Sequence, residues 1–408
     1  MSDRQIPDRQ VPDRQIPGRQ SREFDVVVYG ATGFTGRLVA QYLAGRASQQ
    51  PGPVGAWAMA GRNREKLEAV RGEIGAPADT PLIVADADDA GSLAAMAERA
   101  RVVLTTVGPY QLYGEGLLAA CIAAGTDYTD LCGEPAWMAK MIEAYARDAA
   151  ASGSRVVFSA GFDSIPSDMG VWFLQREAQA RFGAPATEAA LRVVSMKGTF
   201  SGGTAASFQE TMKAAFKDPS VVGLLKDPFA LCPGFEGPKQ PAMSKPRIDE
   251  EAGVWLAPFV MAAINTKTVH RSNMLQGHAY TEGFTYEEMV ETSPGEMGKK
   301  VAEAIASDDS LSPEKAPKPG EGPSEAEREN GSYELVLKGK TAAGEALSVR
   351  VAGDKDPGYG STSKMIAQTA LTLAADEGLP GGFHTTAMLG EALMKRLTAH
   401  AGLTFEVL

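Results

Sequence analysis

The sequence is poor in side chains that bind metals or form disulfides. Its 408 residues include three cysteines and four histidines, and these share neither a zinc-ligand spacing nor a disulfide framework. A metal centre is therefore not expected, and unpaired thiols favour a reducing, cytoplasmic environment. A chain of this length can bury its core without such crosslinks.

Long apolar runs are also missing. The uncharged stretch 252–266, AGVWLAPFVMAAINT, is interrupted by Gly253, Pro258 and Asn265 and falls short of the roughly 20 apolar residues of a membrane-spanning helix. It is either a buried strand or loop, or an apolar substrate wall, or a peripheral membrane contact. Basic residues are outnumbered, 40 against 51 acidic ones, and the resulting net charge of −11 argues against nucleic acid as the partner.

The first residues repeat a short polar unit. Residues 3–20 read DRQIP, DRQVP, DRQIP and GRQ, and the regular prolines are incompatible with a continuous helix. We expect residues 1–22 to be a disordered tail, and they show no signal-peptide pattern.

Between residues 23 and 165, short apolar runs alternate with helical patterns. The pattern predicts helices at 92–100, 115–124 and 135–151, and six strands at 25–30, 56–60, 82–85, 102–106, 127–131 and 155–159. This alternation predicts a Rossmann-type, doubly wound parallel sheet, an α/β fold.

After residue 165 the pattern changes. Helices are expected at 167–182 and 205–216, a strand at 190–196, an excursion or lid at 218–250 and an exposed loop at 307–330. Residues 333–337 and 347–351 alternate with period two around Gly344, which indicates an antiparallel hairpin. Two helices, 361–375 and 386–399, close the chain.

The strongest motif is a glycine-rich turn between the first strand and a helix. It reads Gly30-Ala31-Thr32-Gly33-Phe34-Thr35-Gly36. Gly30 permits the tight turn, Gly33 lets the backbone approach a pyrophosphate, and Gly36 allows close helix–strand packing. The free N–H groups of the following helix attract the anion. We expect a dinucleotide here, bound through residues 30 and 32–36.

The second strand ends without the carboxylate that binds an NAD ribose. It is followed instead by Arg62, Asn63 and Arg64. Because a guanidinium matches a 2′-phosphate, we predict NADP(H), with Arg62 as the main ligand and Arg64 as helper. The alternative is a solvated arginine at the start of a helix that Asn63 caps.

Two further segments are expected around the cofactor. Asp86, after the third strand, is either an adenine-edge acceptor or an ordinary strand-ending residue. Val107, Gly108 and Pro109 follow the fourth strand and should run beside the nicotinamide ribose.

Taken together, these motifs resemble the saccharopine dehydrogenase-like oxidoreductases, in particular the trans-acting enoyl reductases. The resemblance covers residues 24–408 and is carried by VVYGATGFTG (27–36), AGRN (60–63), VGPY (107–110), DYTDLCGE (127–134), AGFDSIPSD (160–168), SGGT (201–204), WLAPFVMA (255–262) and GYGSTSKM (358–365). It implies an NADP-binding Rossmann domain, an inserted α+β domain with a mixed or antiparallel sheet, and C-terminal helices that return to the first domain. We place these parts at residues 23–165, 166–354 and 355–408.

The resemblance also implies hydride transfer to a C=C or C=N bond. Saccharopine reductases need arginines for a substrate with several carboxylates, yet residues 198–204 and 255–266 contain neither Arg nor Lys. This departure favours a hydrophobic substrate. The Tyr-x-x-x-Lys pair of short-chain dehydrogenases is absent.

Reduction needs a proton donor as well as a hydride. Tyr110 or Tyr113 could supply the proton, with Asp130, Glu134 or Asp163 ordering it or the ribose. The alternative is that the tyrosines pack in the core and the carboxylates cap helices. The turn 201–204 is either a substrate anion site or a simple capped turn.

We therefore predict an NADPH-dependent reductase of an enoyl bond in a hydrophobic or lipid-derived small molecule. An imine-reducing amino-acid oxidoreductase and a non-catalytic NADP-binding, lipid-associated protein are the alternatives. We also expect a cytoplasmic location and a homodimer. A peripheral membrane contact is left open.

Overall fold

The computed structural model describes residues 21–49, 55–198, 202–310, 312, 314–318, 320–376 and 378–408. The predicted repeat tail, apart from Ser21 and Arg22, and Ser201 of the predicted anion turn lie outside these residues.

The first sheet has seven strands in the order β13-β6-β5-β4-β1-β2-β3, all but β13 from the first half of the chain, and every described strand pair is parallel. The predicted doubly wound sheet is confirmed, and a short strand from the far end of the chain extends it. The strands are β1 (Phe24–Tyr29), β2 (Trp57–Gly61), β3 (Leu82–Val84), β4 (Ala100–Thr105), β5 (Asp127–Thr129), β6 (Arg155–Val157) and β13 (Gly382–His384).

Helices connect these strands at α1 (Phe34–Gln49), α2 (Arg64–Glu73), α3 (Ala90–Ala97), α4 (Tyr110–Ala124) and α5 (Pro135–Ser152). Two bounds differ from the predicted helices by three residues or more. The helix predicted to end at residue 100 stops at Ala97, because Ala100 already pairs with Phe24 in the sheet. The next helix begins at Tyr110 rather than residue 115, so Tyr110 and Tyr113 lie in its first turn.

The second sheet is mixed, in the order β14-β12-β11-β7-β10-β9-β8. Its strands are β7 (Ala186–Lys197), β8 (Arg247–Asp249), β9 (Val254–Pro258), β10 (Thr285–Glu291), β11 (Ser332–Thr341), β12 (Ala346–Gly353) and β14 (Leu403–Val407). The predicted hairpin is β11–β12, in which Leu335 faces Val351 and Leu337 faces Val349. Within this second sheet, β7 and β10 pair in parallel, and the other described strand pairs are antiparallel.

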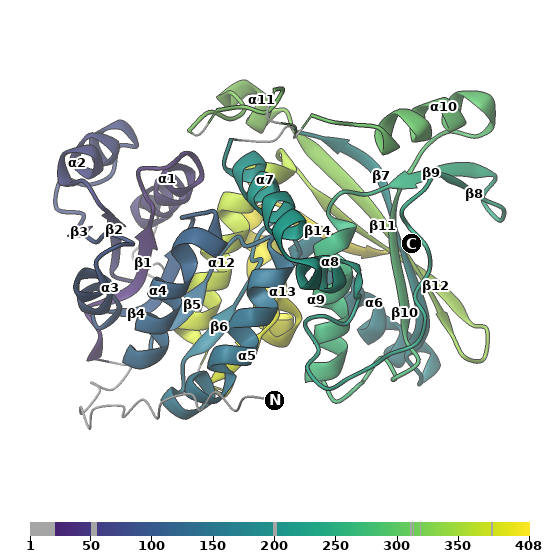
Figure 1. The fold of residues 1–408 in the computed structure, drawn as a ribbon, viewed down its shortest axis with the longest axis horizontal. Coiled ribbons are helices and arrows are strands. Elements are labelled where there is room, and N and C mark those ends of the chain that lie inside the picture. Colours follow the sequence, from purple (N-terminus) through teal and green to yellow (C-terminus); the bar gives the residue numbers. More distant parts are fainter. Residues whose placement is uncertain are drawn as a thin grey trace.

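The remaining helices are α6 (Ile165–Phe182), α7 (Gly202–Lys217), α8 (Pro219–Lys226), α9 (Ala262–Leu275), α10 (Gly295–Ala306), α11 (Glu325–Glu329), α12 (Thr362–Ala375) and α13 (Gly390–Arg396). Figure 1 shows the two sheets side by side, with α6, α9 and α12 among the helices around their junction. One buried cluster runs from Val26 and Val28 of β1 through Ile366 of α12 to Leu335 and Leu337 of β11. The predicted limits of the domains stay predictions.

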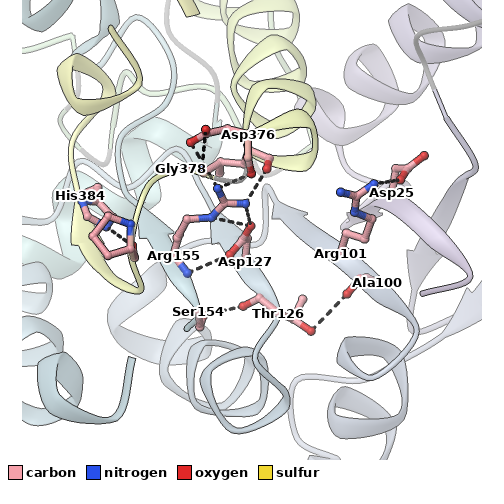
Figure 2. Close-up of polar contacts among 12 residues, drawn as sticks. Asp25, Ala100, Arg101, Thr126, Asp127, Ser154, Arg155, Asp376, Gly378 and His384 are labelled. Atoms are coloured by element: carbon pink, nitrogen blue, oxygen red, sulfur yellow. Dashed lines mark hydrogen bonds and ion pairs between the residues drawn. The ribbon is translucent and has the colours of Figure 1, made fainter. Parts of the chain in front are cut away.

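An ion pair ties the C-terminal part to the parallel sheet at the edge opposite the glycine loop. Arg155, at the start of β6, is almost fully buried and pairs with the buried Asp127 at the start of β5. Its guanidinium also donates to the carbonyls of Leu373, 2.6 Å away, and Asp376, 2.7 Å away, at the end of α12. Figure 2 shows this cluster around Arg155.

Candidate functional site

The glycine loop between β1 and α1 accepts glycine alone at its tightest points. Gly30 has a φ of +89°, which L side chains rarely adopt. A Cβ on Gly36 would lie 2.1 Å from the carbonyl oxygen of Gly30, so helix and turn could not approach as they do. A Cβ on Gly30 would lie 2.9 Å from Oγ1 of Thr106, which places the loop after β4 directly beside the turn.

The helix that follows presents an anion-binding end. α1 begins at Phe34, its first turn contains no acidic residue, and Gly33 is exposed. The first N–H groups of a helix have no acceptor within it, and the helix dipole adds positive potential there. The loop and this helix end therefore fit a dinucleotide pyrophosphate, as the sequence predicts.

The three residues after β2 behave differently from one another. Asn63 caps α2, because its side chain accepts a hydrogen bond of 2.8 Å from the N–H of Lys66. Arg64 pairs with Glu68 one turn later, at 3.1 Å. Arg62 is exposed, and no described carboxylate lies within 4.0 Å of its guanidinium. Of the two arginines, Arg62 is the one free to meet a phosphate.

Arg62 also lies close to the glycine loop and to Asp86. The loop residue Thr32 approaches Gly61, where a Cβ would lie 3.7 Å from its hydroxyl oxygen. Burial and the nearby charge of Asp86 raise the pKa of Tyr29 to about 12, and Arg62 opposes this shift. Asp86 already accepts a hydrogen bond of 3.1 Å from the N–H of Asp88 in its own turn. The ends of β1, β2 and β3 thus meet at one place, as a ribose and adenine pocket requires.

Glu134 has a position that the sequence did not reveal. Its carboxylate accepts hydrogen bonds of 2.9 Å from the N–H groups of both Tyr110 and Gln111, and so caps α4 from across the crevice. Pro109, which precedes α4, offers no side-chain cap. The anion-binding end of α4 is therefore occupied by a protein carboxylate, and the start of α4 is bonded to the segment that follows β5.

The two tyrosines predicted as proton donors differ in exposure. Tyr110 is buried, and its hydroxyl accepts from the N–H of Leu131 at 3.1 Å and donates to the carbonyl of Thr105 at 3.4 Å. Burial raises its pKa well above the ordinary value. Tyr113 is 43% exposed. Their catalytic roles stay predictions, and the bonds of Tyr110 already explain its position.

Asp130 is fully buried after β5 and is saturated with donors. It accepts from the hydroxyl of Tyr128 at 2.9 Å and from the N–H groups of Cys132 and Ser159 at 3.0 Å each. Burial raises its pKa to about 7 against the opposing effect of these bonds. It fixes the two loops that form the floor of the crevice, and its catalytic role is likewise a prediction.

Asp163 follows β6 and differs from Asp130 in having an open carboxyl. No other described residue donates a hydrogen bond to it, and the residue is partly accessible. Its oxygens lie beside two glycines, 3.6 Å from a Cβ built on Gly133 and 3.1 Å from one on Gly161. Burial raises its pKa to about 7, so a large fraction carries a proton at neutral pH.

The second half of the chain covers the crevice from one side. Ser207 of α7 lies 3.5 Å from a Cβ built on Gly108, and the hydroxyls of Thr204 and Tyr359 are 3.1 Å apart. Of the lysines beside the predicted anion turn, Lys197 is exposed and Lys213 pairs with Glu210 at 2.6 Å.

A cavity of about 800 Å³ lies beyond α8. Its wall combines the excursion at 225–244 with the apolar stretch at 258–267, including Phe229, Phe235 and Phe259. The buried Lys267 binds the carbonyl of Leu225 at the end of α8, at 3.0 Å. The apolar stretch is therefore β9, the start of α9 and part of a cavity wall.

Within the described ranges, no group of three or more His, Cys, Asp or Glu side chains could hold a metal ion. None of the described helices is long and apolar enough to cross a membrane. Cys121, Cys132 and Cys232 are free and buried.

Comparisons with known proteins agree with this geometry. Residues 26–157 match the family model of the saccharopine dehydrogenase NADP binding domain. A Mycobacterium tuberculosis protein named as a trans-acting enoyl reductase is 41% identical over 415 residues, 94% of this chain and 97% of the relative. The trans-acting enoyl reductase of Mycobacterium ulcerans is 39% identical over 413 residues, 92% and 96% of the two chains. Apo saccharopine dehydrogenase (L-Glu forming) from Saccharomyces cerevisiae shares the fold, with a TM-score of 0.53 and 12% identity over 94% of this chain and 99% of the yeast chain.

Proposed function

This chain belongs to the trans-acting enoyl reductases of the saccharopine dehydrogenase-like oxidoreductases, and we propose that it reduces the C=C bond of a hydrophobic, lipid-derived substrate. It is an NADP-dependent oxidoreductase that acts on a small molecule, and NADP(H) is its cofactor. The glycine loop would hold the pyrophosphate and Arg62 the 2′-phosphate.

The observation that carries the proposal is the carboxyl of Asp163, which follows β6 and accepts no hydrogen bond from any other described residue. When bound, the nicotinamide supplies a hydride to one carbon of the double bond. The neighbouring carbon then needs a proton, and a carboxyl whose pKa is raised to about 7, as that of Asp163 is, can donate one near neutral pH. Tyr110 is less suited, since its pKa is high and its hydroxyl is bonded on both sides. The carboxyl of Asp163 is therefore our proposed donor.

The apolar nature of the substrate is supported by two surfaces. The cavity beyond α8 has aromatic and proline side chains along much of its wall. Its lining also contains Lys226, Lys239 and Lys267, and Lys267 donates to the carbonyls of Leu225 and Ala263. At the helices beside the crevice, Leu112 of α4 and Phe208, Met212 and Phe216 of α7 are exposed apolar side chains. An acyl chain would find apolar contact area on both surfaces.

Turnover assays test the proposal. The full chain is mixed with NADPH and enoyl thioesters of increasing chain length, and NADPH oxidation is followed. We expect kcat/KM to rise with chain length. In the D163N variant we expect kcat to fall about 100-fold or more with the Kd for NADPH unchanged, while Y110F keeps most of its activity. In the wild type, kcat should fall as the pH rises above about 7, because Asp163 then loses its proton.

Other outcomes would contradict the proposal in different ways. Oxidation of NADPH by imines alone would favour an amino-acid oxidoreductase. NADPH binding without oxidation by any of these substrates would favour a binding protein. A large loss of kcat in Y110F, with D163N active, would reassign the donor.

The compartment and the assembly are proposals as well. The three free cysteines fit a reducing cytoplasm. A homodimer and a peripheral membrane contact through the exposed residues of α7 remain part of the proposal, and both can be checked by sedimentation with and without lipid vesicles.

A further inference from the structure

A segment from the second half of the chain lies against the glycine loop. A Cβ built on Gly322 would lie 2.6 Å from the ring of Phe34, the first residue of α1. Six residues later, the guanidinium of Arg328 sits 5.7 Å from the centre of the same ring. Figure 1 shows α11, which contains Arg328, at the upper edge of the molecule between α1 and α10.

The guanidinium of Arg328 lies over an aromatic ring at the helix end where an anion is stabilised. Cations are stabilised at the C-terminal end of a helix, but this guanidinium lies beside the N-terminal end of α1, where the dipole is positive. Among the described residues, no carboxylate lies within 4.0 Å of it. The guanidinium of Arg328 and the positive end of the α1 dipole thus lie close together.

The nearby carboxylates have other partners. Glu327 bonds to Ser324 in a capping box, and Glu329 pairs with Lys355 at 2.5 Å. Asp356 interacts with Arg328 at longer range, but its oxygens accept from the N–H groups of Tyr359 and Gly360, at 3.0 and 2.7 Å. The anion that Arg328 lacks is therefore not supplied by these side chains.

We propose that Arg328 binds the diphosphate of the bound dinucleotide from the side opposite the glycine loop. A guanidinium is suited to phosphate oxygens because it is planar and permanently charged. This inference rests on NADP(H) binding and not on the proposed substrate or reaction.

The segment holds Arg328 in place before any cofactor arrives. Its NH1 donates to the carbonyl of Pro323 at 2.7 Å, and the carbonyl of Arg328 accepts from the N–H of Asp356 at 3.0 Å. The carbonyl of Glu321 accepts from the N–H of Gly202 at 3.2 Å, which connects the segment to α7. Such preorganisation lowers the entropic cost of binding. Cofactor affinity would then depend on the second half of the chain as well as on the Rossmann sheet.

Binding measurements with four nucleotides test the role of Arg328. The variants are R328M, which removes the charge and keeps an apolar contact with Phe34, and R328K, which keeps the charge. R62A serves as a contrast, and R350M is the matched control, since Arg350 pairs with Glu406 and Glu334 on the second sheet. Each is titrated with NADPH, NADH, ADP-ribose and 2′-AMP, which carries a 2′-phosphate but no diphosphate.

We expect R328M to raise the Kd values for NADPH, NADH and ADP-ribose by a similar factor, about tenfold or more, and to leave the Kd for 2′-AMP unchanged. R328K should be intermediate and R350M like the wild type. R62A should instead weaken the binding of NADPH and 2′-AMP and leave the binding of NADH unchanged. Unchanged NADH and ADP-ribose binding in R328M would overturn the inference, and so would a parallel loss of 2′-AMP, which would indicate general damage. Neither result would affect the assignment of Arg62 or the enoyl substrate.

Discussion

A single buried carboxyl gives the protein a predictable dependence on pH. The folded-state pKa of Asp130, about 7, lies above the ordinary value, so its contribution to stability is present at low pH and is lost as the pH rises from about 4 through about 7. We expect D130N to flatten this decline, because an amide can still accept from the N–H groups of Cys132 and Ser159 and does not ionise. The difference in slope between wild type and variant should be on the order of 1 kcal/mol per pH unit.

Denaturant unfolding at several pH values between 4 and 8 measures this slope. D79N, at an exposed position, is the control and should follow the wild type. Equal slopes for D130N and the wild type would mean that Asp130 ionises in the folded state as it does in the unfolded chain.

At the scale of single residues, the local sequence predicts the roles of some side chains and not of others. The cap formed by Asn63 follows from its place between a strand and an apolar-periodic helix, and the free state of Arg62 is compatible with its predicted role. The bonds of Glu134 to Tyr110 and Gln111 span more than 20 residues, and Arg328 lies almost 300 residues from Phe34. No local pattern encodes such contacts, because they depend on how the sheets meet.

At the scale of elements, α4 depends on a cap from another loop. Removing the carboxylate in E134A would leave the N–H groups of Tyr110 and Gln111 without their acceptor, one of them buried, and we expect a loss of about 2 kcal/mol in the free energy of unfolding. E134Q retains one acceptor oxygen and should lose less. Chemical denaturation measures both. Equal stability of E134A and the wild type would show that water replaces the carboxylate.

The element bounds were predictable where a regular pattern ends in a strong signal. The hairpin β11–β12 alternates with period two and turns at Gly344, whose φ is +90°, and its register follows. The start of α4 was missed because Gly114 and Gly116 interrupt its helical pattern, and a Cβ on Gly114 would lie 2.7 Å from the ring of Trp137. Close packing, not propensity, determines those glycines. Three-residue strands such as β13 are too short to carry a pattern of their own.

At the scale of the whole molecule, the C-terminal segment joins both sheets. β13 pairs with β6 in the parallel sheet, and β14 pairs with β12 in the mixed sheet, only about 20 residues later. Between β12 and β13, α12 packs in the cluster that contains residues of β1 and β11. The family resemblance implied the C-terminal helices that return to the first domain. It did not reveal β13 and β14, because each pairs with an edge strand that a distant part of the chain supplies, β6 for β13 and β12 for β14.

This connection predicts that the two sheets unfold together. Neither sheet can lose its edge strand without disturbing the shared core, and Arg155 ties α12 to β5 and β6 through buried bonds. We expect one calorimetric transition, with the van't Hoff enthalpy equal to the calorimetric enthalpy, and an upward shift of that whole transition when NADPH is added. R155M should lower the single Tm without splitting it, because it removes the positive charge that pairs with the buried Asp127 but removes no strand. K395M, at an exposed pair with Glu391, is the control and should unfold like the wild type. Two resolved transitions, of which NADPH shifts only one, would show that the sheets are independent and that the shared core does not couple them.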